Sequence, residues 1–148
     1  MDIEKTKEIH RLLLAFTGLF HEKYLLRFRN DIDIQTDLKK NQRKILNLLY
    51  HESPITLTEI GKRLDIEKGS LTALIDVLMD RGLVIRSNDP KDRRKCLIYL
   101  SPQGNELVER LITYYSEKME HSLSNYDPQE VEAFEKNLRQ VVDFLKKV

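Results

Sequence analysis

The fold of this 148-residue chain is decided by residues 56–104, TLTEIGKRLDIEKGSLTALIDVLMDRGLVIRSNDPKDRRKCLIYLSPQG. At the start of this stretch, Thr56 and Glu59 have the spacing of a capping box, in which a hydroxyl and a carboxylate each satisfy a free backbone amide where a helix begins. The apolar pattern that follows ends near Leu64. We therefore expect a short helix that starts at Thr56 and ends near Leu64.

A second helix is expected over about 68–81, after a turn at 65–67 of the length that joins two helices at a steep angle. Gly82 ends this helix as a left-handed C′ residue. One face of the helix is apolar and should meet the core; its residues are Leu71, Leu74, Ile75 and Leu78. Taken alone, this pattern also fits an ordinary amphipathic surface helix.

The opposite face of the second helix carries short side chains near its N-terminus. Such a face lets the backbone lie deep in a major groove about 12 Å wide, where side chains reach phosphates or base edges. The candidate DNA-binding residues on this face are Lys68, Gly69, Ser70, Thr72 and Ala73, and Asp76 points the same way.

A charged hairpin follows the second helix. Strands at 84–87 and 95–100 flank the loop NDPKDRR, whose aspartate–proline pair favours a turn. The arginines of this loop can enter a narrow minor groove, and its second aspartate can hold one of them in the reaching rotamer. The candidate DNA-binding residues of this wing are Lys91, Asp92, Arg93, Arg94 and Lys95; a solvated hairpin tip is the alternative. The order of these elements predicts a winged helix-turn-helix that binds duplex DNA.

The chain before this segment is predicted to be helical, so that the fold is mainly α with a small β-hairpin wing. A helix is expected from about Lys40 to His51, and Ser53-Pro54 ends it because the residue before a proline disfavours the helical conformation. Turn formers at 30–37 separate it from a long amphipathic helix over about 3–29. The apolar stripe of that long helix consists of Ile9, Leu12, Leu13, Phe16, Leu19 and Phe20.

Two more apolar helices follow the hairpin, one opened by Ser101-Pro102 as N-cap and N1, the other beginning beyond Asp127-Pro128. Their stripes are Leu107, Leu111, Tyr115 and Met119, and then Val131, Phe134, Leu138, Val141, Val142 and Leu145. Together with the first helix they exceed what a winged helix can cover. We expect residues 1–37 and 102–148 to form dimerisation helices beside a DNA-binding region at 38–101. The alternative is a monomer whose terminal helices pack only on each other.

The charge of the chain is focused on the wing. The formal net charge is only +1, although proteins that bind nucleic acids are often strongly basic. Four of the five residues at 91–95 are basic, whereas the last helix is acidic near its start, at Glu130, Glu132 and Glu135. This distribution supports a nucleic-acid partner more strongly than the total charge does.

Several other classes of protein are not expected. One cysteine cannot form an intramolecular disulfide, which suits a reducing compartment. No stretch approaches the roughly 18 apolar residues of a membrane span, and the N-terminus is too polar for a signal peptide, so we expect a soluble cytoplasmic protein. No nucleophile–base set, phosphate loop or carboxylate pair predicts an enzyme or a cofactor. The four histidines, His10, His21, His51 and His121, lack metal-binding spacing.

Cys96 has two interpretations. It shares strand parity with the apolar Ile98 and Leu100, which predicts a buried structural thiol. The neighbouring Arg94 and Lys95 would instead favour a redox sensor if the thiol were exposed.

A set of spaced residues carries a family resemblance over about half of the chain. They are Gln42 and Leu46, the run 57–64, Leu71-Thr72, Leu78, Gly82-Leu83-Val84 with Arg86, Asp89-Pro90-x-Asp92-x-Arg94, and Leu100-Ser101-x-x-Gly104. With these residues the chain resembles the MarR family of multiple-antibiotic-resistance-type transcriptional regulators. The resemblance implies a homodimer that binds a pseudo-palindromic duplex, most often a repressor released by a small molecule or an oxidant. It also implies that Asp92 and Arg94 act together at the minor groove.

The chain departs from the family pattern at three positions. Ala73 stands where a longer polar or basic side chain is frequent, which removes one base contact. Gly61 replaces the usual alanine, which is explained if the next helix crosses closely there, and Lys39 stands where a capping hydroxyl is common. The resemblance also places an effector, such as an aromatic acid, near the helices expected over about 3–29 and 40–51 and the helix after Ser101. A winged helix retained as a protein-interaction module is the other functional class.

Overall fold

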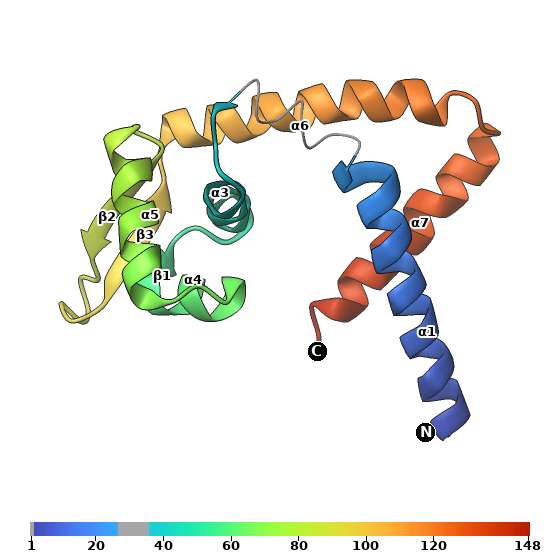
Figure 1. The fold of residues 1–148 in the computed structure, drawn as a ribbon, viewed down its shortest axis with the longest axis horizontal. Helices are drawn as coiled ribbons and strands as arrows, with labels where there is room; N and C mark the ends of the chain where they lie inside the picture. Colours follow the sequence, from blue (N-terminus) through green and yellow to red (C-terminus); the bar gives the residue numbers. More distant parts are fainter. Residues whose placement is uncertain (1, 27–35) are drawn as a thin grey trace. The chain divides into compact units, whose positions relative to one another are not determined.

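The structure is a computed structural model that describes residues 2–26 and 36–148. Figure 1 shows the elements in chain order, and the chain divides into two compact units, Met1–Val108 and Glu109–Val148. The elements are α1 (Ile3–Phe20), η1 (His21–Leu25), α3 (Lys40–Glu52), β1 (Ile55–Thr56), α4 (Leu57–Leu64), α5 (Lys68–Asp80), β2 (Val84–Asn88), β3 (Cys96–Leu100), α6 (Pro102–Leu123) and α7 (Pro128–Leu145).

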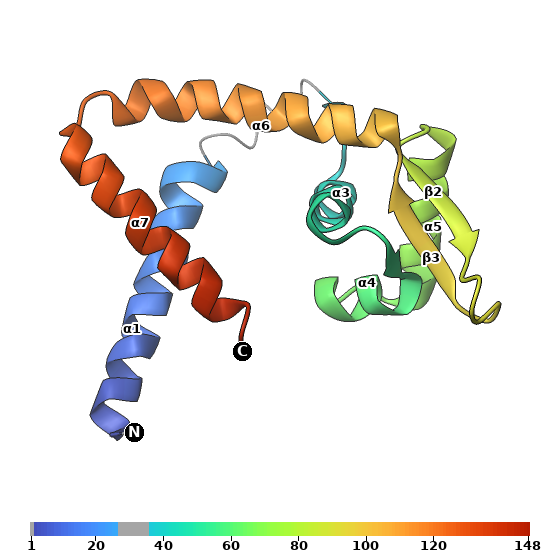
Figure 2. The same cartoon turned by 180° about the vertical axis from the view of Figure 1, so that it is seen from behind.

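The sheet has three antiparallel strands in the order β1-β3-β2. In its register, Ile98 of β3 lies opposite Ile55 of β1 on one side and Arg86 of β2 on the other. The sequence predicted the hairpin of β2 and β3, which Figure 2 shows beside α5, but it missed β1. The two predicted strands are confirmed, and β1 was missed because it is only two residues long and pairs with a strand far away in the sequence.

One hydrophobic core joins α3, α4, α5, the sheet and the start of α6. The predicted core face of α5 is confirmed, since Leu71, Ile75 and Leu78 are buried and Leu74 packs against them. The other buried apolar residues are Leu38, Ile45, Leu46, Leu49, Ile55, Ile60, Leu83, Val84, Ile98 and Val108. This core holds the helix-turn-helix and the wing together as one body.

The short helix α4 begins where the sequence predicted. The Thr56 hydroxyl accepts a hydrogen bond from the backbone N–H of Glu59 at 3.2 Å. The Glu59 carboxylate is instead bound by Arg63 at 2.7 Å, so only the hydroxyl half of the capping box forms. Hydrogen bonds to Glu59 and to Glu52 raise the pKa of Arg63 and tie α4 to the end of α3.

Glycines make the two tight junctions around α5. A Cβ on Gly61 would lie 3.1 Å from the carbonyl oxygen of Ile66 and 3.4 Å from Leu71 Cδ2, which confirms the close crossing. Gly82 has φ +70, and its N–H donates to the Met79 carbonyl at 2.8 Å. The N–H of Leu83 donates to the Leu78 carbonyl at 2.9 Å, so α5 ends in a Schellman motif with Gly82 as the left-handed C′ residue that the sequence predicted.

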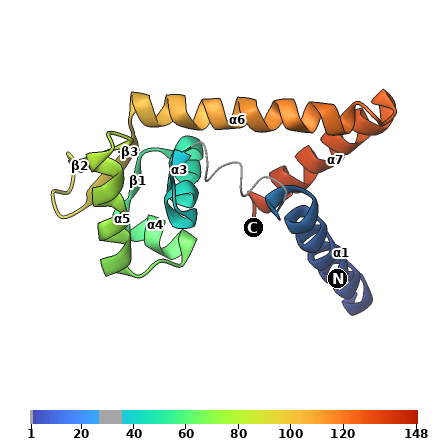
Figure 3. The ribbon, with the colours of Figure 1, turned by 45° about the horizontal axis from the view of Figure 1, so that its top comes forward.

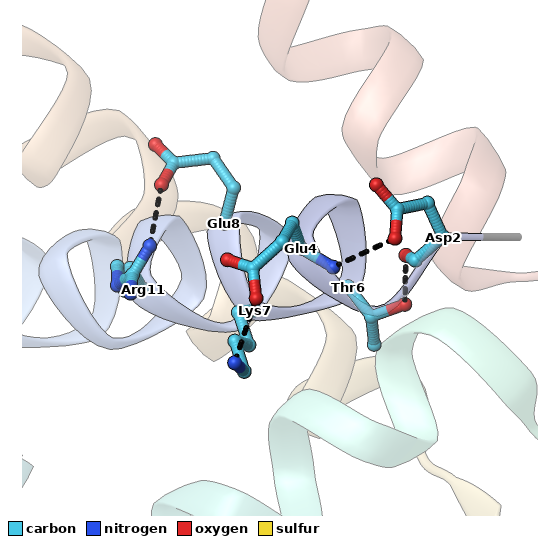
Figure 4. Close-up of polar contacts among 6 residues, drawn as sticks. All are labelled: Asp2, Glu4, Thr6, Lys7, Glu8 and Arg11. Atoms are coloured by element: carbon cyan, nitrogen blue, oxygen red, sulfur yellow. Dashed lines mark hydrogen bonds and ion pairs between the residues drawn. The ribbon is translucent and has the colours of Figure 1, made fainter.

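The predicted long first helix is interrupted. It is α-helical to Phe20 and then takes a π-helical turn, η1; residues 27–29 of the prediction lie outside the described residues. Asp2 caps its start by accepting from the Glu4 N–H at 3.3 Å, and Figure 4 shows this cap with the ion pairs Lys7–Glu4 and Arg11–Glu8. Among the described residues of α1, none is buried in the single chain.

Side chains of Ser101 and Asp127 start the last two helices. The Ser101 hydroxyl accepts from the Gly104 N–H at 2.9 Å and donates to the Gly82 carbonyl at 2.6 Å, which confirms the predicted N-cap and fastens α6 to the turn after α5. Figure 3 shows α6 as one unbroken helix. Asp127 accepts from the Gln129 N–H at 2.7 Å, and no residue of α7 is buried within the described single chain.

Over residues 2–26 and 36–148, none of the helices combines the length and apolarity that a membrane crossing requires. The same residues hold no cluster of three histidine, cysteine or acidic side chains that could bind a metal ion.

Candidate nucleic-acid interface

The face of α5 that the sequence predicted to contact DNA points away from the core and toward solvent. Lys68, Gly69, Ser70 and Ala73 are exposed and Thr72 is half-buried. The hydroxyl of Thr72 donates to the Lys68 carbonyl at 2.9 Å, which uses its proton and leaves its lone pairs available as acceptors. The helix therefore presents a short-chained, nearly uncharged surface with one ammonium group at its N-terminus.

Space around Gly69 is open. A Cβ built there meets no atom within 4 Å, and the glycine has no positive φ that would require it. Glu67, the N-cap of α5, makes no side-chain capping bond. The first amides of α5 carry the positive end of the helix dipole, which suits a phosphate or a groove edge.

A hollow of about 440 Å³ lies beside α4 and the start of α5. It is lined by Leu57, Thr58, Gly61, Lys62, Ile66, Lys68 and Leu71. The ammonium groups of Lys62 and Lys68 add positive charge beside the exposed face of α5, which suits contact with a DNA backbone.

The wing tip is shaped by two aspartates. Asp89 accepts from the Lys91 N–H at 2.8 Å, and the Asp89 N–H in turn donates to the Lys95 carbonyl at 3.0 Å. Asp92 Oδ1 accepts from both the backbone N–H of Arg94 at 3.1 Å and its Nε at 3.2 Å. The expected pinning of an arginine therefore falls on Arg94, whose side chain is 93% exposed.

Cys96 is partly buried and packs against the hydrophobic core, so the expected burial of its thiol is only partial. Its Sγ accepts a hydrogen bond from Arg86 Nε at 3.0 Å, and Arg86 NH1 lies 4.0 Å from Asp76 Oδ1. The predicted strand parity with Ile98 is confirmed, but Cys96 is the first residue of β3, beside the wing loop, and is less deeply buried than Ile98.

Two arginines near this surface make hydrogen bonds between elements that the sequence did not predict. Arg81 at the end of α5 donates to the carbonyls of Thr36 at 2.8 Å and Asp37 at 3.2 Å. Arg86 bridges α5 and β3. The parity of β2 could have placed Arg86 on the face of Val84, but the register with Cys96 needed the folded hairpin.

All four histidines are exposed.

Comparison with known proteins identifies this architecture. The sequence profile of the MarR family matches residues 38–96. The chain is 31% identical to the uncharacterised HTH-type transcriptional regulator YcgE of Bacillus subtilis over 132 residues, which are 88% of this chain and 80% of that protein. It is 34% identical to the uncharacterised HTH-type transcriptional regulator YkoM of the same organism over 86 residues, 58% of this chain and 56% of that protein. The match therefore spans little more than half the length of YkoM.

One further relative and two solved structures are similar. The HTH-type transcriptional repressor YetL of Bacillus subtilis is 31% identical over 103 residues, 68% of this chain and 62% of that protein. The structure of a mutant MarR from E. coli matches with a TM-score of 0.68 and 25% identity, covering 90% of this chain and 95% of that chain. A MarR family protein from Bacillus stearothermophilus shares the fold with a TM-score of 0.72 and 20% identity, covering 99% of each chain.

Proposed function

Because this chain belongs to the MarR family of DNA-binding transcriptional regulators, we propose that it is a homodimeric repressor of a pseudo-palindromic operator. One observation carries the proposal. The wing holds the exposed Arg94 against Asp92, while α5 presents a short-chained face on the same compact unit. Such a unit has one element for each groove of duplex DNA.

The proposed major-groove element is the N-terminal half of α5. Lys68, Ser70 and Thr72 supply a charge and two hydroxyls that reach phosphates or base edges, while Gly69 and Ala73 let the backbone approach. The open space around Gly69 supports this role, since a recognition helix needs room for the groove walls.

The proposed minor-groove element is the wing. Lys91, Arg93 and Lys95 are exposed and supply phosphate contacts, and Arg94 enters the groove in the rotamer that Asp92 holds. Pre-organisation reduces the side-chain entropy that an arginine loses on binding. The wing therefore supplies most of the electrostatic attraction between DNA and this chain, whose formal net charge is +1.

The proposed dimer forms through residues 1–37 and 102–148, with 38–101 as the DNA-binding region. Large apolar side chains of α1 and α7 are exposed in the single chain, among them Leu12 at 61% and Phe144 at 65%, and this exposure supports a partner chain. A two-fold dimer would set its recognition helices in successive major grooves roughly 34–36 Å apart.

The proposed release signal is a small molecule of the phenolic or aromatic-acid class. This part of the proposal is supported by membership of the family rather than by a contact in the chain.

The proposed function is tested by titrating the full chain into a fluorescent duplex from its own promoter at several salt concentrations. We expect a preference for a palindromic sequence and a steep slope of log K against log salt, at about 0.9 for each phosphate contact. Light scattering of the free protein should give the mass of two chains. DNA binding that depends neither on salt concentration nor on sequence would indicate a winged helix that acts as a protein-interaction module instead.

A further inference from the structure

Arg86 lies at the junction of the recognition helix and the wing. In the register of the hairpin it stands opposite Ile98, which is fully buried, so its side chain belongs to the face of β2 that also carries the buried Val84. Cys96 precedes Ile98 by two residues and therefore lies diagonally across the strand pair on the same face, within reach of a long side chain.

The guanidinium of Arg86 contacts both DNA-binding elements. Its Nε donates to Cys96 Sγ at 3.0 Å, at the base of the wing loop, and its NH1 lies 4.0 Å from the carboxylate of Asp76 on α5. One planar group thus joins the middle of the recognition helix to the strand that leaves the wing.

Neither contact is strong enough to matter much for folding. Thiol sulfur is a weak hydrogen-bond acceptor, and the ion pair is 41% exposed at Arg86 and 58% exposed at Asp76, where solvent screens it. The core beneath is closed by apolar side chains without them. The two contacts join different elements of the DNA-binding unit, so their effect would fall on the placement of the wing loop beside α5 rather than on the stability of the fold.

We propose that Arg86 is a positioning residue, which sets the wing relative to α5 so that the major and minor grooves are engaged together. The proposal rests on the proposed function, because it assumes that α5 and the wing both contact DNA. It assigns Cys96 a role as the hydrogen-bond acceptor that anchors this arginine. It predicts that Arg86 governs the preference for the operator over other duplexes and does not itself neutralise a phosphate.

The test compares Arg86→Gln with the wild-type chain on its operator and on an unrelated duplex of the same length. We expect the variant to bind the operator about tenfold more weakly, to bind the unrelated duplex as before, and to keep its salt slope on both. Lys91→Gln is the comparison for a phosphate contact, with weaker binding to both duplexes and a slope reduced by about 0.9. Ser87→Ala, the neighbouring residue in β2, is the control that leaves both affinities unchanged.

A double-mutant cycle tests the path through Cys96. Cys96→Val removes the acceptor and should weaken operator binding, Cys96→Ser should restore most of it, and Cys96→Val should add nothing in the Arg86→Gln background. Additive losses would overturn the proposal, as would an Arg86→Gln variant that loses both affinities equally with a reduced slope. Thermal unfolding of each variant should stay near that of the wild type, and a large loss of stability would identify a structural role instead. If the wild-type chain itself shows no operator preference, the proposed function fails first.

Discussion

Asp92 binds Arg94 twice, through the backbone N–H at 3.1 Å and through Nε at 3.2 Å, although the two residues are only two positions apart at the tip of the wing. The carboxylate therefore fixes both the backbone turn and the direction of the guanidinium. The arginine side chain remains 93% exposed and free to meet a ligand.

Replacement of this arginine should affect DNA binding and little else. We expect Arg94→Ala to weaken operator binding by about tenfold or more, equivalent to roughly 1.4 kcal/mol, and Arg94→Lys to recover little because a lysine cannot keep the Nε hydrogen bond. Fluorescence anisotropy gives the affinity and light scattering the oligomeric state. An unchanged affinity in Arg94→Ala would mean that the wing does not contact DNA.

The Gly69→Ala substitution separates folding from DNA contact on α5. A Cβ at this position meets no atom within 4 Å, and alanine is more favourable than glycine in a helix by about 1 kcal/mol. The temperature of thermal unfolding should therefore stay the same or rise slightly. Operator binding should nevertheless weaken, because the new methyl group would stand between the helix backbone and the groove. Full affinity in this variant would place the DNA backbone farther from α5 than we propose.

Gly104 is required where α6 meets the turn after α5. A Cβ there would lie 2.1 Å from the Leu83 carbonyl oxygen and 2.9 Å from Leu100 Cδ1, so Gly104→Ala must displace backbone. We expect a loss of roughly 1–3 kcal/mol or more in the free energy of unfolding, measured by urea denaturation. Gly18→Ala in α1, where a Cβ meets nothing within 4 Å, is the matched control and should not destabilise the chain.

The proposed dimer can be tested with two leucines of α1. Leu12 and Leu14 are both 61% exposed, but they lie about 200° apart around the helix, and only Leu12 belongs to the stripe with Phe16 and Leu19. Leu12→Lys should shift the mass measured by light scattering from two chains toward one, whereas Leu14→Lys should leave it unchanged. Equal effects of the two variants would show that the stripe is not the contact face.

An aromatic acid should release the operator if the proposed regulation is correct. We expect salicylate to weaken operator binding by a factor within the roughly 5- to 150-fold range typical of allosteric coupling. The measurement is operator affinity at increasing salicylate, with benzyl alcohol as the neutral aromatic control. An affinity that salicylate leaves constant would remove this ligand class from the proposal without affecting DNA recognition.

Some parts of this fold follow from short-range signals. The cap at Thr56, the Schellman motif at Gly82 and the cap at Asp127 each use residues within five positions of one another, so the chain nearby carries the whole interaction. The core face of α5 was equally predictable from the sequence, because helical periodicity places Leu71, Ile75 and Leu78 together whatever packs against them.

Other parts depend on pairs that are distant in sequence. The strand β1 exists because Ile55 meets Ile98, and Arg81 reaches the Thr36 carbonyl across 45 positions. The partial burial of Cys96 and its hydrogen bond from Arg86 depend on the register of the hairpin.

The sequence by itself therefore determined which segments are helix, turn and wing, which side of α5 is apolar, and where the basic charge lies. Periodicity, capping and turn chemistry act over a few residues and leave a readable pattern. Only the tertiary structure decided that the sheet gains a third strand and that Arg86 joins α5 to the wing. Those relationships join residues of different elements, and the packing of the whole unit decides which of them meet.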